Sequence, residues 1–284
     1  MSFDTPTKVK EICKKYNFQP RKSRGQNFLV EKNVVTKIIN ASNIGASDCI
    51  LEIGPGLGIM TDELSRQAKK ILAVEIDKKI VEILQNEFSW PNVDIVRSDI
   101  LDIANETIKA KLGCKEYLIV ANLPYQITSP IIEKFLIGKD KPERLVVMVQ
   151  REVGDRMLAK PPHMNLLALM IEFYSSTKKL FRVSKNSFWP KPKVDSVVME
   201  IIPKKNKEIE MIFSNGNINS FWELVRNGYR SKRKYLANNI APFLKISKDK
   251  IMEIFQFLDW DAKIRPENLS LDDWVSLYQQ LYPK

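Results

Sequence analysis

Short apolar runs alternate with amphipathic segments from about residue 49 onward. The segments at 78–88 and 127–136 repeat apolar residues every three or four positions, as helices do. Between such segments lie runs with the length and β-branched content of buried strands, at residues 49–54, 71–77, 93–99, 117–123 and 145–150. Strands that alternate with helices predict βαβ units, and therefore an α/β fold with a parallel sheet covered on both faces.

The pattern changes after residue 203. Two more apolar stretches, at 169–174 and 196–202, predict strands at the far edge of the sheet. Residues 203–207 then interrupt the apolar pattern and predict a linker. Beyond the linker the periodicity is helical throughout, at 221–229, 232–240, 250–258 and 271–281. We therefore expect a first domain at residues 1–203 and a small helical domain at residues 204–284.

Charge is distributed unevenly along the 284 residues, whose net charge is +11. Residues 1–24 carry +5, residues 25–177 carry −2, and residues 178–284 carry +8. A lysine-rich chain can simply place its charges on solvated faces. In that case, however, the excess positive charge would be spread evenly along the chain and would not be confined to its two ends. The distribution favours a nearly neutral body with basic ends, including an N-terminal arm at 1–24, that bind a polyanion. Nucleic acid and an anionic membrane surface both fit this charge.

Several classes of protein are disfavoured by composition. No apolar run approaches the roughly 20 residues of a membrane span, and the polar, basic N-terminus does not predict a secretory signal. Cys13, Cys49 and Cys114 lack the spacing of a zinc site or a disulfide framework, so a reducing compartment is expected. His163 is the one histidine and is expected on a loop. We expect no metal and no catalytic pair of histidines.

A glycine-rich turn follows the first strand of the predicted sheet. Gly54, Gly56 and Gly58 alternate with other residues just before a predicted helix, where the backbone can approach a ligand closely. The dinucleotide fingerprint requires a small residue at the position of Ile59, so NAD fits poorly. A turn that serves close packing alone is the other interpretation.

Two acidic residues end the next two predicted strands. Glu75 lies 21 residues beyond Gly54, a spacing suited to holding ribose hydroxyls, and Asp99 closes the following strand. With the glycine turn they resemble the S-adenosylmethionine site of Rossmann-like methyltransferases. The resemblance implies Gly54 beside the methionine moiety, Glu75 on the ribose and Asp99 on the adenine amine. The cofactor-binding residues that we predict in this part of the chain are Gly54, Gly56, Glu75, Asp99, Ile100 and Asn122.

The fourth predicted strand ends in Asn122-Leu123-Pro124-Tyr125. A strand-ending turn would also contain Asn and Pro, but the tetrapeptide matches the signature of enzymes that methylate exocyclic amines. The Asn122 side-chain oxygen and the Leu123 carbonyl would accept hydrogen bonds from an adenine N6 amine, and Tyr125 would stack on the base. Transfer would be an in-line displacement that depends on positioning. The nitrogen would lose its proton to water, so no dedicated base is expected.

Nearly the whole chain resembles the KsgA-type rRNA adenine N6,N6-dimethyltransferase family. The match includes residues 25–29 (GQNFL), 149–153, 188–196 and 265–270, in the family's order. It implies a Rossmann-like class I S-adenosylmethionine-dependent methyltransferase sheet with a small, all-helical C-terminal domain. It also implies that Asn27 and Leu29 line the cofactor site. Phe188 would be a second aromatic beside the flipped base, although a core position is equally compatible with its sequence context.

The family resemblance implies a function and a partner. Enzymes of this type dimethylate two adjacent adenosines in the 3′-terminal hairpin of small-subunit rRNA during ribosome biogenesis. The partner would be that rRNA or an immature small subunit, and we expect a cytoplasmic monomer that does not bind membranes. The RNA-binding residues that we predict from the basic ends are Arg21, Lys22, Arg24, Arg230, Lys232, Arg233 and Lys234.

Departures from the family pattern leave the RNA target open. Ser23-Arg24 replaces a basic–aromatic pair, residues 161–168 are short by about two positions, and residues 231–237 read SKRKYLA where an RRKTLR run is expected. A large-subunit rRNA methyltransferase of the erythromycin-resistance type is therefore an alternative. An RNA-binding assembly factor with secondary catalysis is another. A DNA adenine methyltransferase fits less well, because no sequence-reading domain is evident.

Overall fold

The computed structural model describes all residues except 1–3, 22–24, 214–216, 232 and 283–284, and it divides into two compact units. The first unit comprises residues 1–154 and 177–203, and the second comprises 155–176 and 204–284. The division after Pro203 coincides with the predicted linker. Residues 155–176, however, group with the C-terminal residues and not with the sheet, which the sequence pattern did not indicate.

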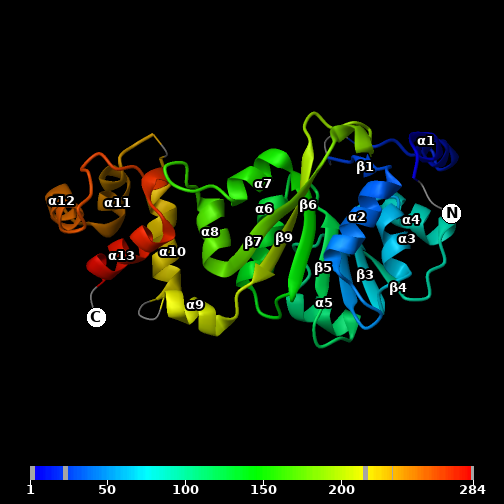
Figure 1. The fold of residues 1–284 in the computed structure, drawn as a ribbon, viewed down its shortest axis with the longest axis horizontal. Coiled ribbons are helices and arrows are strands. Elements are labelled where there is room, and N and C mark those ends of the chain that lie inside the picture. The colour runs from blue at the N-terminus through cyan, green and yellow to red at the C-terminus, as the bar shows by residue number, and fades with distance from the viewer. Residues whose placement is uncertain (1–3, 22–24, 214–216, 232, 283–284) are drawn as a thin grey trace. The chain divides into compact units, whose positions relative to one another are not determined.

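The first unit contains a seven-stranded sheet in the order β4-β3-β2-β5-β6-β9-β7 (Figure 1). β4, β3, β2, β5 and β6 run parallel, whereas β9 is antiparallel to β6, so the sheet is mixed. The bounds of the strands are β2 (Cys49–Ile53), β3 (Lys70–Glu75), β4 (Val93–Arg97), β5 (Leu118–Asn122), β6 (Arg144–Gln150), β7 (Ser175–Val183) and β9 (Ser196–Pro203). The predicted α/β fold and its first five strands are confirmed.

Helices cover both faces of this sheet (Figure 1). As a consequence, every residue of the central strand β2 is buried. α4 illustrates how they form: the Asp77 side chain caps it by accepting from the Lys79 amide, and its buried face is Ile80, Ile83 and Leu84. The helices of this part of the chain are α1 (Pro6–Lys15), α2 (Lys32–Ser42), α3 (Ile59–Ser65), α4 (Lys78–Glu87), α5 (Asn105–Leu112), α6 (Thr128–Ile137) and α7 (Arg151–Met157).

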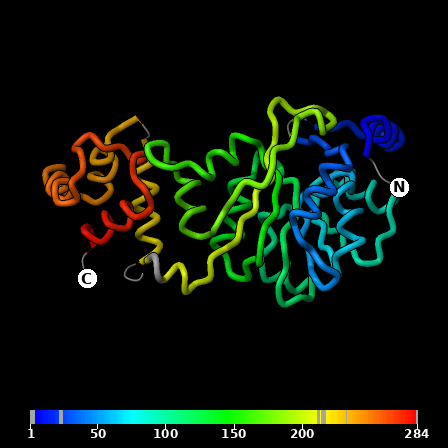
Figure 2. Tube along the Cα trace, viewed as in Figure 1, coloured from blue at the N-terminus to red at the C-terminus, as the bar shows by residue number. Residues whose placement is uncertain are grey.

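A separate two-stranded ribbon joins distant parts of the first unit. β1 (Phe28–Leu29) pairs antiparallel with β8 (Phe188–Trp189), which follows the short 3-10 helix η2 (Lys185–Ser187). Figure 2 shows the blue N-terminal segment reaching the yellow-green segment that contains β8. The ribbon therefore joins the segment that precedes α2 to the segment that precedes β9.

The second unit is helical in the residues that the structure describes. Its core is an aromatic cluster in which Phe173 lies 5.6 Å from Phe221 and 5.4 Å from Trp222, measured between ring centroids. The Trp222 indole donates to the Tyr174 hydroxyl at 2.8 Å. The helices are α8 (Leu166–Tyr174), α9 (Asn206–Ile212), α10 (Ile218–Gly228), α11 (Leu236–Leu244), α12 (Lys248–Phe257), η3 (Pro266–Asn268) and α13 (Leu271–Leu281).

One predicted strand is wrong. Residues 169–174 form most of α8, and the strand that joins the sheet edge is β7, immediately after it. The Asn165 side chain caps α8 by accepting from the amides of Leu167 and Ala168. The apolar run belongs to a helix whose residues are nearly all buried in the aromatic core.

The expectation of no disulfide is also wrong, because the structure joins Cys49 and Cys114. Cys49 begins β2 and Cys114 lies shortly before β5, the neighbouring strand. The sheet thus brings two cysteines that are 65 residues apart to a Cα–Cα distance of 6.4 Å. Cys13 is free and buried, and burial raises the pKa of its thiol to about 11.

Among the described residues, no helix has the length and apolar content required to cross a membrane. His163 lies on a loop, as predicted, with its amide donating to the Lys160 carbonyl at 2.8 Å.

Candidate active site

A cavity of about 290 Å³ lies in the first unit where the parallel strands end at their carboxyl side. It brings together ten of the residues singled out from sequence, namely Asn27, Leu29, Gly54, Gly56, Glu75, Asp99, Asn122, Leu123, Pro124 and Tyr125. The volume is near the lower end of the range for small-molecule sites. Carboxyl ends of neighbouring parallel strands converge at one edge, which explains why residues so far apart in the chain meet here.

The glycine turn between β2 and α3 forms one wall of the cavity. Gly54, Gly56 and Gly58 all have positive φ angles, of +68°, +56° and +81°. A Cβ atom at position 56 would come within 3.1 Å of the Phe28 ring, so glycine allows the N-terminal segment to lie against the turn. Gly58 is the N-cap of α3, and the turn therefore presents backbone amides beside a helix N-terminus.

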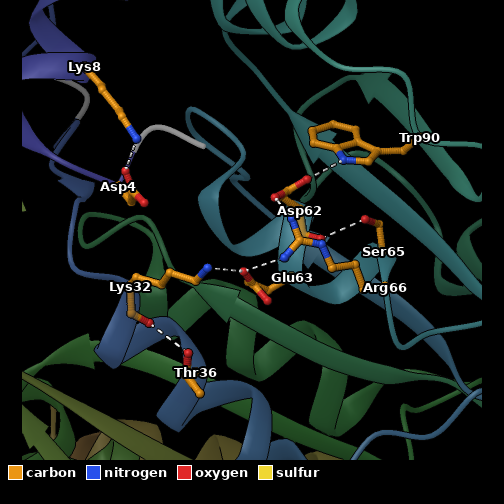
Figure 3. Close-up of polar contacts among 9 residues, drawn as sticks. All are labelled: Asp4, Lys8, Lys32, Thr36, Asp62, Glu63, Ser65, Arg66 and Trp90. Carbon is orange, nitrogen blue, oxygen red and sulfur yellow. Dashed lines mark hydrogen bonds and ion pairs between the residues drawn. The ribbon is translucent and has the colours of Figure 1, made fainter. Parts of the chain in front are cut away.

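Polar side chains fix the helix that follows the glycine turn (Figure 3). Arg66 forms ion pairs with Asp62 at 2.7 Å and with Glu63 at 2.9 Å, and Lys32 of α2 reaches Glu63 at 3.5 Å. The Trp90 indole also donates to Asp62 at 3.1 Å. These contacts tie α3, the helix that follows the turn, to α2 and to the segment before β4.

Glu75 is buried at the end of β3, and its Oε1 accepts a hydrogen bond from the Asp77 amide at 2.9 Å. Burial raises the pKa of Glu75 to about 7, although that hydrogen bond acts in the opposite direction. Asp99 is half-buried, and its Oδ1 accepts from the Leu101 amide at 2.9 Å. Each carboxylate oxygen has more than one lone pair, so both groups can accept further hydrogen bonds from a ligand.

The structure adds a residue that the sequence argument missed. Glu52 is fully buried in β2 and lines the same cavity, and neither of its carboxylate oxygens has a hydrogen-bond partner with good geometry. Burial raises the pKa of Glu52 to about 8, and the charge of nearby Glu75 acts in the same direction, while the Thr61 hydroxyl partly opposes it. The available signal was an acidic residue inside an apolar strand, two positions before Gly54.

Asn122 to Tyr125 form the wall of the cavity at the end of β5. The Leu123 amide donates to the Met148 carbonyl at 3.0 Å, which continues the pairing of β5 with β6. The Asn122 Oδ1 atom is buried and accepts no hydrogen bond from the described residues. The Tyr125 hydroxyl lies 2.8 Å from the Ser196 hydroxyl of β9, and burial raises the pKa of Tyr125. An oriented aromatic ring and an unused acceptor thus share the cavity.

The N-terminal segment closes another side of the cavity. Asn27 and Leu29 contribute to the lining, and β1 is held by its pairing with β8. The Gln26 side-chain amide donates to Asp77 Oδ2 at 3.1 Å, which links this segment to the loop that follows Glu75. Gln26 was not singled out from sequence, although it lies within the GQNFL segment.

Two predicted site residues are not brought into the cavity lining. Ile100 follows Asp99, but its side chain is buried elsewhere. Phe188 is buried in β8, paired with Leu29, within a core cluster that includes Val183 and Val198. Its position corresponds to the alternative interpretation of Phe188, a core residue, and not to an aromatic beside the acceptor base.

The predicted RNA-binding residues are partly described. Arg21 in the first unit and Arg230, Arg233 and Lys234 in the second are exposed. Lys22, Arg24 and Lys232 lie outside the described residues. Within the described ranges, no cluster of three or more His, Cys, Asp or Glu side chains could hold a metal ion.

The fold and the site together define a class I methyltransferase: a sheet of this strand order, a glycine turn after its first parallel strand, and acids after the next two. The family model described as ribosomal RNA adenine dimethylase matches residues 17–281. The chain therefore belongs to the ribosomal RNA adenine dimethylase family.

Individual relatives agree with this assignment. A ribosomal RNA small subunit methyltransferase A from Dehalococcoides mccartyi is 38% identical, covering 95% of this chain and 91% of the relative. One from Anoxybacillus flavithermus is 36% identical, covering 98% and 96%. A dimethyladenosine transferase structure from Plasmodium falciparum has a TM-score of 0.69 at 25% identity, covering 87% of this chain and 94% of that one. The structure of the 23S rRNA methyltransferase ErmE, at 21% identity and a TM-score of 0.64, shares the fold and covers 90% and 99%.

Proposed function

We propose that this enzyme transfers methyl groups from S-adenosylmethionine to N6 of two adjacent adenosines in the 3′-terminal hairpin of small-subunit rRNA, during ribosome biogenesis. The observation that carries the proposal is the buried, unused Asn122 Oδ1 in the same cavity as the glycine turn, Glu75 and Asp99. A buried acceptor without a partner costs free energy in the free protein. An exocyclic amine, which donates two hydrogen bonds, would supply what this atom lacks.

The residues of the cavity fit S-adenosylmethionine. Its methionine part would lie along the glycine turn, where positive φ angles leave room for a close approach. Glu75 would accept hydrogen bonds from ribose hydroxyls, and Asp99 from the adenine amine. When bound, the cofactor supplies a methyl group made electrophilic by its sulfonium.

The chain itself would supply positioning. Asn122 Oδ1 and the Leu123 carbonyl would hold the adenine N6 amine, and Tyr125, oriented by Ser196, would stack on the base. No basic side chain is needed near the amine, because the methylated nitrogen releases its proton to water. We propose that the active unit is a monomer. We place the activity in the cytoplasm, where small subunits are assembled.

The relatives favour the small subunit as the target. Those at 35–38% identity carry the name ribosomal RNA small subunit methyltransferase A. The likeness to ErmE lies below 25% identity and concerns the fold only. We therefore prefer the small-subunit target to a large-subunit one of the erythromycin-resistance type.

Labelled methyl transfer tests the proposal. Under-methylated small subunits, free small-subunit rRNA and large subunits would each be incubated with the protein and labelled S-adenosylmethionine, and dimethyladenosine would be measured by mass spectrometry. Asn122→Ala should reduce transfer about 100-fold, because the amine loses its orientation, and should change binding of the particle less than about twofold. Asn40→Ala, on the exposed face of α2, is the matched control and should behave as wild type.

Two results would contradict the proposal. Incorporation into large subunits alone would show that the target is wrong. Loss of particle binding in Asn122→Ala, as large as its loss of transfer, would show that Asn122 serves binding and not the orientation of the amine.

A further inference from the structure

Two neighbouring loops of the second unit form a braced surface. The loop at 229–235 leads into α11, and the loop at 261–265 leads into η3. The Leu236 amide donates to the Ile264 carbonyl at 2.8 Å, and the Tyr229 hydroxyl donates to the Pro266 carbonyl at 2.8 Å. Asn239, buried in α11, donates to the carbonyls of Gly228 and Ser231. These hydrogen bonds therefore hold the described ends of the loop at 229–235 and the end of the loop at 261–265 in place without a ligand.

Tyr235 and Arg265 meet on this surface. The Arg265 guanidinium carbon lies 5.8 Å from the centroid of the Tyr235 ring, within the range of a cation–π contact. Tyr235 is 37% exposed, and the Arg265 side chain is 43% exposed. The Arg265 Nη1 atom lies 4.0 Å from Oε1 of Glu267, which is the outer limit of an ion pair. Both groups thus keep a large part of their surface in water.

The Tyr235 side chain has no capping role in the helix that it precedes. Tyr235 is the N-cap of α11 and makes no side-chain capping hydrogen bond. Its ring is instead partly exposed beside the Arg265 guanidinium, where a planar ligand could reach it.

Positive charge surrounds the aromatic ring. Arg230, Arg233 and Lys234 are exposed on the same loop, and Lys263 is exposed on the neighbouring one. The acidic side chains on these loops are Asp261, whose Oδ1 accepts from the Lys263 amide at 2.7 Å, and Glu267. Basic residues outnumber acidic ones, so an anionic ligand is favoured over a cationic or neutral one.

We propose that Tyr235 and Arg265 form a stacking site for one unpaired nucleobase of the RNA substrate, with Arg233 and Lys234 on the adjoining phosphates. This inference rests on the proposed function, because it takes rRNA to be the substrate. Aromatic rings and guanidinium planes stack on bases that are splayed out of a helix, and basic groups beside them hold the backbone. The site is distinct from the cavity of the first unit, and its ligand is a non-reacting nucleotide.

Binding across a range of salt concentrations tests the stacking site. Kd would be measured between the full-length protein and under-methylated small subunits for wild type, Tyr235→Ala, Tyr235→Phe and Arg265→Ala. Tyr235→Ala should raise Kd about tenfold without changing the salt slope, because it removes stacking and no charge. Tyr235→Phe should bind within about twofold of wild type, since phenylalanine also stacks. Phe257→Ala, which removes a 73% exposed aromatic from α12, is the matched control and should have no effect.

Ultraviolet crosslinking followed by mass spectrometry identifies the ligand. A nucleotide adduct on the loop at 229–235 is expected in wild type and should be lost in Tyr235→Ala. Unchanged affinity in Tyr235→Ala would overturn the stacking site, as would a crosslink from this loop to a ribosomal protein. Weak binding by Tyr235→Phe equal to that of Tyr235→Ala would also overturn it. If the proposed function itself were wrong, the wild-type protein would neither bind nor methylate small subunits. If only the stacking site were wrong, the wild-type protein would do both and Tyr235→Ala would bind as tightly as wild type.

Discussion

Replacing Glu52 by glutamine should stabilise the protein in a pH-dependent way. Glu52 is fully buried, has no hydrogen-bond partner of good geometry, and has a pKa raised to about 8 from an ordinary value of 4.5. Glutamine has nearly the same shape and does not ionise. The substitution therefore removes the ionisable group while leaving the packing of β2 almost intact.

The direction and the size of this stability difference follow from proton linkage. Between pH 4.5 and 8 the folded state keeps the Glu52 proton while the unfolded state releases it, so wild-type stability falls as pH rises through this window. Each pKa unit by which the folded and unfolded states differ corresponds to about 1.4 kcal/mol of stability. At about pH 7, Glu52→Gln should be more stable than wild type by about 3 kcal/mol. Near the lower end of the window, both side chains are neutral when folded and the gain should nearly vanish.

Urea titrations at several pH values would measure the free energy of unfolding. Glu116→Gln, which removes an exposed carboxylate, is the matched control and should show no comparable pH-dependent gain. A Glu52→Gln effect of the same size at every pH would refute the reasoning, because the ionisation penalty would then not be its source. Destabilisation throughout would indicate instead that the neutral carboxyl group makes a hydrogen bond that glutamine cannot replace.

Two further predictions concern the glycine turn and the basic loop. In urea titrations, Gly58→Ala should lower the free energy of unfolding by about 1 kcal/mol or more beyond the loss caused by Gly113→Ala. Both have positive φ, but a Cβ at position 58 would lie 2.9 Å from Leu84, whereas at 113 nothing lies within 4 Å; equal losses would contradict this. Replacing Arg233 and Lys234 together by alanine should weaken binding to small subunits and lower the salt slope by about 1.5 to 2; an unchanged slope would show that neither contacts phosphate.

The parallel part of the sheet could be predicted from sequence because its strands are buried on both faces. Such strands read as continuous apolar runs, and the helices between them keep a clear period. The same property made residues 169–174 ambiguous. A short helix that is buried on nearly all sides has the composition of a buried strand. β7, in contrast, is a partly exposed edge strand with polar residues, so its sequence gave little indication of a strand.

The candidate site was predictable where function depends on short motifs at strand ends. Such motifs determine the local backbone conformation through a few neighbouring residues, as the glycine turn and Asn122-Leu123-Pro124-Tyr125 do. What could not be predicted depends on pairings between distant segments, such as Tyr125 with Ser196 and Gln26 with Asp77. The Cys49–Cys114 bond belongs to the same class, because strand order decides which cysteines become neighbours.

The acidic lining of the cavity explains why the positive charge lies elsewhere in the chain. Glu52, Glu75 and Asp99 all contribute to the cavity, and three ionised carboxylates there would repel an approaching RNA backbone. Burial raises the pKa of Glu52 to about 8 and that of Glu75 to about 7, which reduces this negative charge near neutral pH. We propose that the remaining attraction comes from exposed basic residues outside the cavity, among them Arg21, Arg233 and Lys234. A nearly neutral catalytic body with basic ends is therefore the arrangement that lets an acid-lined cavity accept a polyanion.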